Sequence, residues 1–97
     1  MPIPVGEPAA EWREIPIMPE AVAGEEGEGS YAFTVKASAA DVQLFYEEEL
    51  AELGWSLLAI SEGEMNATIM IFQKGAEVAS VTTFLLDEET IYVFLVK

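Results

Sequence analysis

The sequence contains no cysteine and no histidine among its 97 residues. Without cysteine, the chain forms no disulfide, no thiolate nucleophile and no thiolate metal site. Without histidine, it lacks the commonest general base of enzymes and the commonest ligand of transition metals. These two absences weigh against catalysis and against a transition-metal centre.

Basic residues are also scarce. The chain has 4 lysines and arginines against 18 acidic residues, which gives a formal net charge of −14. A surface of this charge repels DNA, RNA and anionic membranes, so we expect no nucleic-acid partner. Cations and basic proteins are the charged partners that the composition favours.

Long hydrophobic runs are missing as well. No apolar stretch reaches the ~18 residues that a membrane-spanning helix needs, so we expect no membrane span. The first residues, MPIPVGEPAAEW, have neither a basic start nor an apolar stretch, and we therefore expect no signal peptide in this chain. Because 52% of the residues are hydrophobic, the chain is expected to fold rather than to remain disordered.

One segment, residues 38–55, predicts a well-defined amphipathic helix. Ser38 suits the N-cap, Asp41 completes a capping box three residues later, and Gly54 suits the left-handed position after the helix end. At 100° per residue, one face of this helix is apolar. That face consists of Val42, Phe45, Tyr46, Leu50 and Leu53.

Alternating and β-branched residues predict strands on both sides of the helix. The expected strands are residues 30–36, 55–60, 67–74, 77–86 and 90–96, while residues 24–29 (GEEGEG) and 61–66 (SEGEMN) are expected to be loops. This order predicts an α+β, two-layer sandwich in which one amphipathic helix packs on a mainly antiparallel sheet of about five strands (β-α-β-β-β-β).

The length of the chain predicts a single domain over residues 12–97, preceded by an extended lead of residues 1–11. Residues 12–22 contain two prolines and are expected to form a strap. Residues 67–74 and 90–96 are apolar at both odd and even positions, which predicts that both faces of the sheet are buried. One helix covers only one face, so the strap, a second copy, a partner or a ligand must cover the other. We expect the strap together with a homodimer contact.

Two sequence patterns resemble a known type of module. The segment IPIMPEA (15–21) contains P-x-x-P-x-A, and residues 42–55 contain V-x-x-F-Y-x-x-x-L-x-x-x-G-W. Together with the aromatic strand YAFTV, they resemble a small uncharacterised bacterial module of envelope-associated or lipoprotein-like proteins, over roughly residues 12–97. The resemblance implies a non-catalytic accessory domain, and an extracytoplasmic location if the chain belongs to a longer precursor.

Five residues are candidates for an interaction surface or a pocket. Glu49 lies near the middle of the apolar helix face, where a carboxyl group would have a raised pKa; alternatively, it reaches water at a sheet edge, which we favour. Together with Phe72, the aromatic residues Tyr46, Trp55, Tyr92 and Phe94 would line an apolar pocket between helix and sheet, or would simply form the core.

No catalytic, nucleotide-binding or calcium-loop motif occurs, so we expect no enzyme, no cofactor and no dedicated metal site. The composition and the resemblance favour a non-catalytic interaction or accessory module of a bacterial protein, self-associating or bound to an unidentified protein. Two alternatives stay open: an acidic charge mimic that binds a basic partner, and a carrier of a small apolar ligand.

Overall fold

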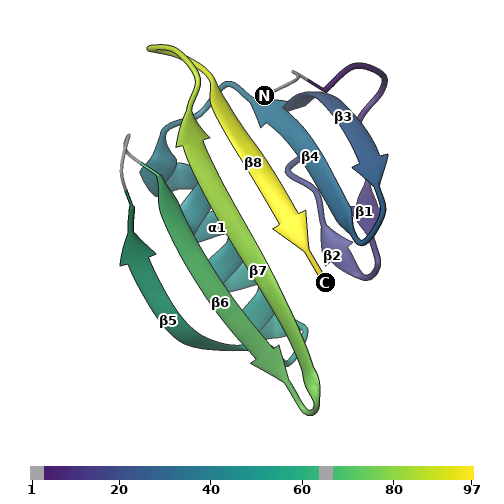
Figure 1. Cartoon of the computed structure of the whole chain (residues 1–97), viewed down its shortest axis with the longest axis vertical. Coiled ribbons are helices and arrows are strands. Elements are labelled where there is room, and N and C mark those ends of the chain that lie inside the picture. Colours follow the sequence, from purple (N-terminus) through teal and green to yellow (C-terminus); the bar gives the residue numbers. More distant parts are fainter. Residues whose placement is uncertain (1–3, 64–66) are drawn as a thin grey trace.

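The computed structural model describes residues 4–63 and 67–97. Within these residues, one helix packs on one face of a six-stranded antiparallel sheet, and a two-stranded hairpin lies beside the helix (Figure 1). The predicted α+β architecture is confirmed, although the sheet has one strand more than expected and the hairpin is additional.

The elements follow one another in an order that the figures keep. They are β1 (Glu11–Trp12), β2 (Ile15–Pro16), β3 (Ala21–Gly27), β4 (Ser30–Val35), α1 (Ala39–Glu52), β5 (Ser56–Glu62), β6 (Thr68–Lys74), β7 (Glu77–Leu85) and β8 (Ile91–Val96). The strand order in the large sheet is β3-β4-β8-β7-β6-β5. Helix α1 thus carries the chain from β4 to the far edge at β5, and three antiparallel strands then return to β4. The predicted loop 61–66 is only partly described: residues 61 and 62 belong to β5, and residues 64–66 lie outside the described residues.

The ends of α1 follow the predicted capping pattern. The Asp41 amide donates a hydrogen bond to the Ser38 hydroxyl at 3.1 Å, and the Ser38 amide donates to the Asp41 carboxylate at 3.5 Å. At the other end, Gly54 has a φ of +94°, which ends the helix and turns the chain toward β5. The side chains of Val42, Tyr46 and Leu50 are buried beneath the helix, so these apolar positions form the face that meets the sheet.

The predicted acidic loop 24–29 is wrong for most of its length, because residues 24–27 belong to strand β3. Gly24 lies opposite Phe33 in β4, and a side-chain carbon at Gly24 would overlap the Tyr31 hydroxyl. The bare glycine therefore lets the Tyr31 ring pack against β3, where its hydroxyl accepts a hydrogen bond from the Ala9 amide at 2.8 Å. The glycines and glutamates of this segment suggested a loop. Position 24 is instead a strand residue that has to be glycine, because the Tyr31 side chain occupies the space of a side chain there.

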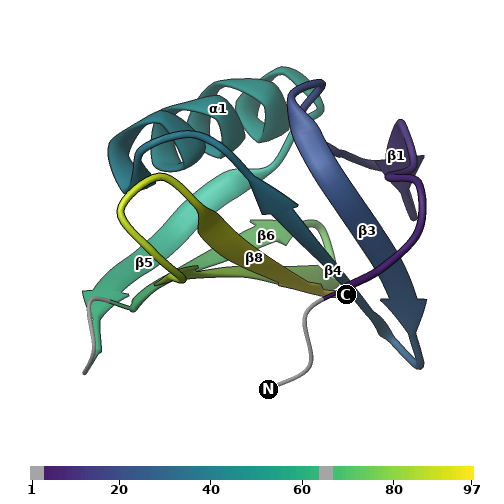
Figure 2. The same cartoon turned by 90° about the horizontal axis from the view of Figure 1, so that it is seen from above.

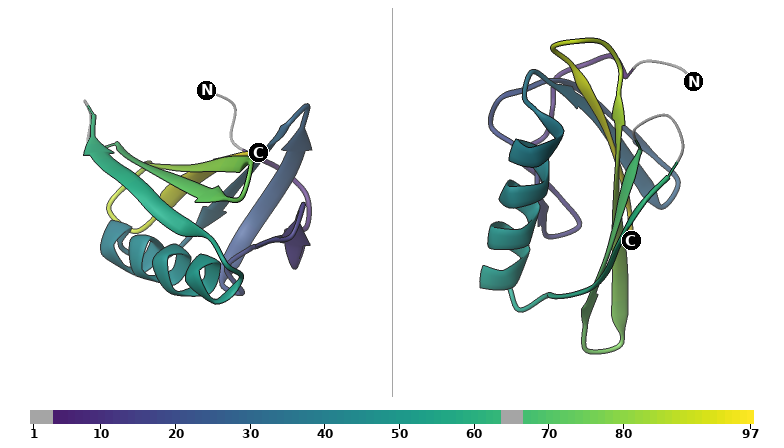
Figure 3. Two further views of the ribbon diagram at one scale, coloured as in Figure 1. Left: turned by 90° about the horizontal axis from the view of Figure 1, so that it is seen from below. Right: turned by 90° about the vertical axis from the view of Figure 1, so that its left-hand side faces the viewer.

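Most of the strap, residues 12–20, lies on the same side of the sheet as α1, and its last two residues begin strand β3 (Figures 2 and 3). Trp12, Ile15, Ile17 and Met18 are buried in the core cluster that also contains Tyr46 and Leu50. The expectation that the strap covers the second face is therefore wrong. A sheet of six strands is about 29 Å wide, whereas a helix with its side chains is about 10 Å across. The strap thus fills the part of the inner layer that α1 leaves free.

The hairpin of β1 and β2 is fastened to the end of β8. Its turn residues, Arg13 and Glu14, have φ angles of +48° and +70°, a left-handed conformation that side chains disfavour. The Arg13 guanidinium donates to the Lys97 carbonyl at 3.1 Å, and the Lys97 ammonium donates to the Arg13 carbonyl at 2.8 Å. This pair of hydrogen bonds, the Arg13–Lys97 clasp, holds the strained turn in place.

Candidate functional site

The strand register assigns each side chain of the sheet to one of two faces, because directly paired residues point to the same side. On the side of α1 and the strap, the central strands contribute fully buried apolar residues. They are Phe33 and Val35 of β4, Val93 and Leu95 of β8, Val81 of β7 and Met70 of β6. This inner face is the core of the protein.

The opposite side of the sheet, here called the open face, is not crossed by any helix or strand of the described residues (Figure 3). It is formed by Ala23, Glu25, Gly27, Ser30, Ala32, Thr34, Tyr92, Phe94, Val96, Val78, Ser80, Thr82, Phe84, Ile69, Ile71, Gln73, Ser56, Ala59 and Ser61. From the lead, Pro4 reaches its margin and borders a shallow hollow of about 180 Å³ together with Ala32 and Phe94. These strands are apolar on both faces, but the prediction that both faces are buried is wrong for the described residues, because most of the second face has no cover.

The large side chains of the open face are only partly shielded. Phe94, Phe84, Ile69 and Ile71 are half-buried, because each leans on its neighbours in the sheet rather than on a second layer. Tyr92 is more deeply buried, and its ring centroid lies 6.1 Å from that of Phe84. Burial raises the pKa of the Tyr92 phenol, and the nearby charge of Glu25 raises it further.

Charge is almost excluded from the open face. The residues that point outward from β4, β8, β7 and β6 include no acidic and no basic side chain, although the chain carries 18 acids. Glu25, on the edge strand β3, is the charged member of the face as defined above. The net charge of −14 therefore comes from other parts of the chain, including strand residues such as Glu26, Glu62 and Glu77, and the outward positions of the four central strands carry none of it.

The structure separates the five candidate residues into three places. Tyr92 and Phe94 lie on the open face, whereas Tyr46 is fully buried beneath α1, in the core cluster that also contains Phe33 and Phe72. The space expected to form a ligand pocket between helix and sheet is occupied by these core side chains. Among the described residues no group is placed to hydrogen-bond the Tyr46 hydroxyl, and burial strongly raises the pKa of this phenol.

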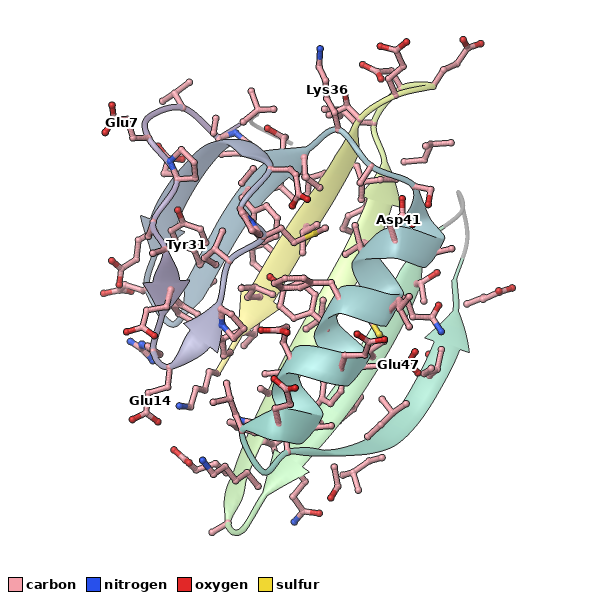
Figure 4. All side chains as sticks on the ribbon, turned by 180° about the vertical axis from the view of Figure 1, so that it is seen from behind. Glu7, Glu14, Tyr31, Lys36, Asp41 and Glu47 are labelled. Atoms are coloured by element: carbon pink, nitrogen blue, oxygen red, sulfur yellow. The ribbon has the colours of Figure 1, made fainter. Side chains whose placement is uncertain are left out.

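Glu49 and Trp55 lie together at a groove between the hairpin and the end of α1. The groove has a volume of about 520 Å³, and Glu11, Glu14 and Glu52 line it as well, with Lys74 at its border. Trp55 is buried at its base, with the Lys97 ammonium 5.5 Å from the centre of its ring. Figure 4 shows the hairpin with Glu14 beside the helix, and Glu47 on the other side of the helix. Glu49 is half-buried and thus belongs to an acidic groove.

Sequence reasoning missed the small residues of the open face, namely Ala32, Ser80 and Thr82. The alternation in residues 67–74 and 90–96 signalled an apolar second face, but only the register shows which small residues lie beside the large ones. Within residues 4–63 and 67–97, acidic side chains form no cluster of three or more suited to hold a metal ion. No helix in this part of the chain has the length and apolar character that a membrane span requires.

Comparisons of the chain with protein-family models, with curated proteins and with solved structures found no match. Two surfaces of the described residues, the open face and the acidic groove, have the geometry and chemistry of binding surfaces.

Proposed function

We propose that this chain is a non-catalytic interaction module and that the open face of its sheet is the binding surface. The observation that carries the proposal is that the open face is largely apolar and that its four central strands present no charged side chain there. A chain at −14 has many acidic residues, yet none points outward from the four central strands. Apolar patches that a protein keeps free of charge typically mark contact sites for other proteins.

Covering the open face would be energetically favourable. Phe94, Phe84, Ile69 and Ile71 each retain accessible apolar surface, and Val96 is 40% exposed. Burial of apolar area contributes about 25 cal/mol per Å². A partner that removes this surface from water would therefore gain several kcal/mol, on the order of the stability of a small domain.

A photo-crosslinking experiment tests the open face directly. Phe94 is replaced by p-benzoylphenylalanine, which is also aromatic, and the full chain is irradiated in an extract of its host cells and as pure protein. The control carries the same group in place of Leu44, which is 54% exposed on the outer side of α1. We expect protein adducts from position 94 and not from position 44. No adduct from position 94 in either sample, or equal yields from both positions, would contradict the proposal.

The acidic groove supports a second candidate function, the binding of a basic partner. Glu11, Glu14, Glu49 and Glu52 line one groove, so a lysine- or arginine-rich segment would meet several carboxylates at once. An oligolysine peptide is the probe, and its affinity should fall steeply as salt rises from about 50 to about 300 mM. The double substitution Glu49→Gln and Glu52→Gln should weaken binding more than Glu47→Gln with Glu48→Gln, which removes the same charge from helix residues outside the groove. Equal effects would indicate nonspecific attraction to the net charge.

A further inference from the structure

Large and small side chains alternate across the open face, from strand to strand. At the level of Phe94, directly paired residues form a row that runs through all six strands of the sheet. In strand order it is Glu25, Ala32, Phe94, Thr82, Ile69 and Ser61. Strands β8 and β6 thus contribute large apolar residues, and β4, β7 and β5 contribute small ones.

The next row repeats the pattern. It consists of Gly27, Ser30, Val96, Ser80, Ile71 and Ala59, in the same strand order. The open face therefore has two ridges, along β8 and β6, and two valleys, along β4 and β7. Phe84 and Tyr92 lie beyond these rows, at the other end of their strands, where both residues are large.

We propose that the partner of the open face is a second copy of this chain, stacked on it about a two-fold axis that runs along the strands between β7 and β8. This inference rests on the proposed function, because it names the occupant of the same surface. Such an axis reverses the strand order of the second copy. It places β8 of each copy over β7 of the other, and β6 of each copy over β4 of the other.

In the two rows described above, each ridge of one copy faces a valley of the other, while beyond them the aromatic ring of Tyr92 lies over that of Phe84. Phe94 of one copy lies over Thr82 of the other, and Ile69 lies over Ala32. The hollow of about 180 Å³ beside Ala32 has room for an isoleucine side chain, since an apolar cavity of ~150 Å³ already holds a benzene molecule. Sheets that stack about 10 Å apart interdigitate their side chains in this way.

Charge and area are also compatible with a second copy. The axis places Glu25 of each copy over Ser61 of the other, so that the carboxylate meets a hydroxyl group and not its own twin. A face about 29 Å wide with strands about 20 Å long would bury on the order of 1,000 Å² in total. This area lies at the lower limit for a specific contact, and we therefore expect dissociation in the micromolar range.

The first experiment is sedimentation equilibrium of the full chain between about 1 µM and about 1 mM. We expect a reversible change from monomer to dimer in this range. Because each copy carries a charge of −14, dimerisation should strengthen as salt screens the repulsion. This salt dependence is opposite to that of a basic peptide in the acidic groove.

The second experiment tests the axis. Thr82→Lys and Phe94→Glu should each raise the dissociation constant more than about tenfold, because each buries an unpaired charge in the contact. When the two variants are mixed, the introduced lysine of one copy meets the introduced glutamate of the other, while the second contact keeps its native Phe94 and Thr82. The mixture should therefore form a heterodimer with an affinity near that of the native chain.

Controls separate the possible failures. Leu44→Lys on α1 should leave the dissociation constant unchanged, and Ser80→Lys should act like Thr82→Lys in the neighbouring row. Thermal unfolding verifies that each variant is folded. A chain that stays monomeric at the highest concentration, yet still gives adducts with other proteins from position 94, would overturn the second copy but leave the proposed function. A dimer whose dissociation constant does not change with Thr82→Lys or Phe94→Glu, or a mixture of these two variants that does not associate, would overturn the axis.

Discussion

The two faces of the sheet are built from the same strands but lie in different environments. On β8, Val93 and Leu95 are fully buried, while Phe94 between them is half-buried. Both kinds of position are apolar, so the strands alone do not distinguish the faces. The difference comes from the second layer, because α1 and the strap both lie on one side (Figure 2). A strand that is apolar on both faces can therefore be buried on both faces, or it can have one face that nothing in the same chain covers.

The largest expected effect contrasts one phenylalanine from each face. Phe33→Ala leaves a cavity in the covered core and should lower the free energy of unfolding by about 3–5 kcal/mol. Phe94→Ala should cost about 1 kcal/mol in dilute solution, because its side chain is already partly in water. Urea unfolding at low micromolar concentration measures both. Similar losses would mean that the open face is covered in the monomer.

The next effect concerns the tight packing on the covered side. Gly24→Ala should lower stability by about 1–3 kcal/mol, because the added methyl group displaces the Tyr31 hydroxyl from its place near the Ala9 amide. Adding Tyr31→Phe should relieve part of this loss, so that the two changes are not additive. Ala23→Ser, which points to the open face, serves as the control with a change below about 0.5 kcal/mol. Additive losses would contradict the overlap.

Alkaline unfolding sharpens the contrast between two tyrosines. The pKa of Tyr46 in the folded state lies far above its unfolded value near 10, because burial disfavours the phenolate. Above about pH 10 the unfolded chain releases a proton that the folded chain keeps, so stability is complete below this pH and falls as pH rises, by up to about 1.4 kcal/mol per pH unit. Tyr46→Phe should remove most of this slope between about pH 10 and 11.5. Tyr92→Phe, on the open face, should remove less.

The smallest expected effect is a gain. Tyr46→Phe at neutral pH should raise stability by up to about 1 kcal/mol, because it removes a buried hydroxyl that no described residue bonds. Tyr31→Phe is the matched control and should lose about 1 kcal/mol, since its hydroxyl accepts a hydrogen bond from the Ala9 amide. Thermal or urea unfolding compares the two. A clear loss for Tyr46→Phe would show that its hydroxyl has a partner in solution.

The elements whose residues show a clear local pattern, either helix caps or strand alternation, were predicted correctly from the sequence. Ser38, Asp41 and Gly54 mark the helix ends, and alternation located β4 and β6 to β8 within one or two residues. Strand β3 was not predicted, because its glycines and glutamates suggest a loop. The structure shows that Gly24 is instead required by the Tyr31 ring of the neighbouring strand. The side on which the strap packs was also not predictable, because proline-containing segments give no period that selects a face.

The candidate surface was predictable only in part. The sequence predicted Tyr92 and Phe94 as members of an interaction surface or pocket, and the structure places both on the open face, whose apolar character was expected from the alternation. Grouping them with Tyr46 and Trp55 required knowledge of which side each strand presents, and that depends on pairing between residues far apart in the chain. The valleys at Ala32 and Thr82 could not be predicted from a single strand, because a small residue forms a hollow only where a neighbouring strand places a large residue beside it.

The Arg13–Lys97 clasp has a consequence for the order of assembly. It joins residues 84 positions apart, so the entropy of closing that loop must be met by contacts formed earlier. Strand β8 has to settle against β4 before the carbonyl of Lys97 is in reach of the guanidinium. We therefore expect the strained turn to form late in folding and to open early in unfolding.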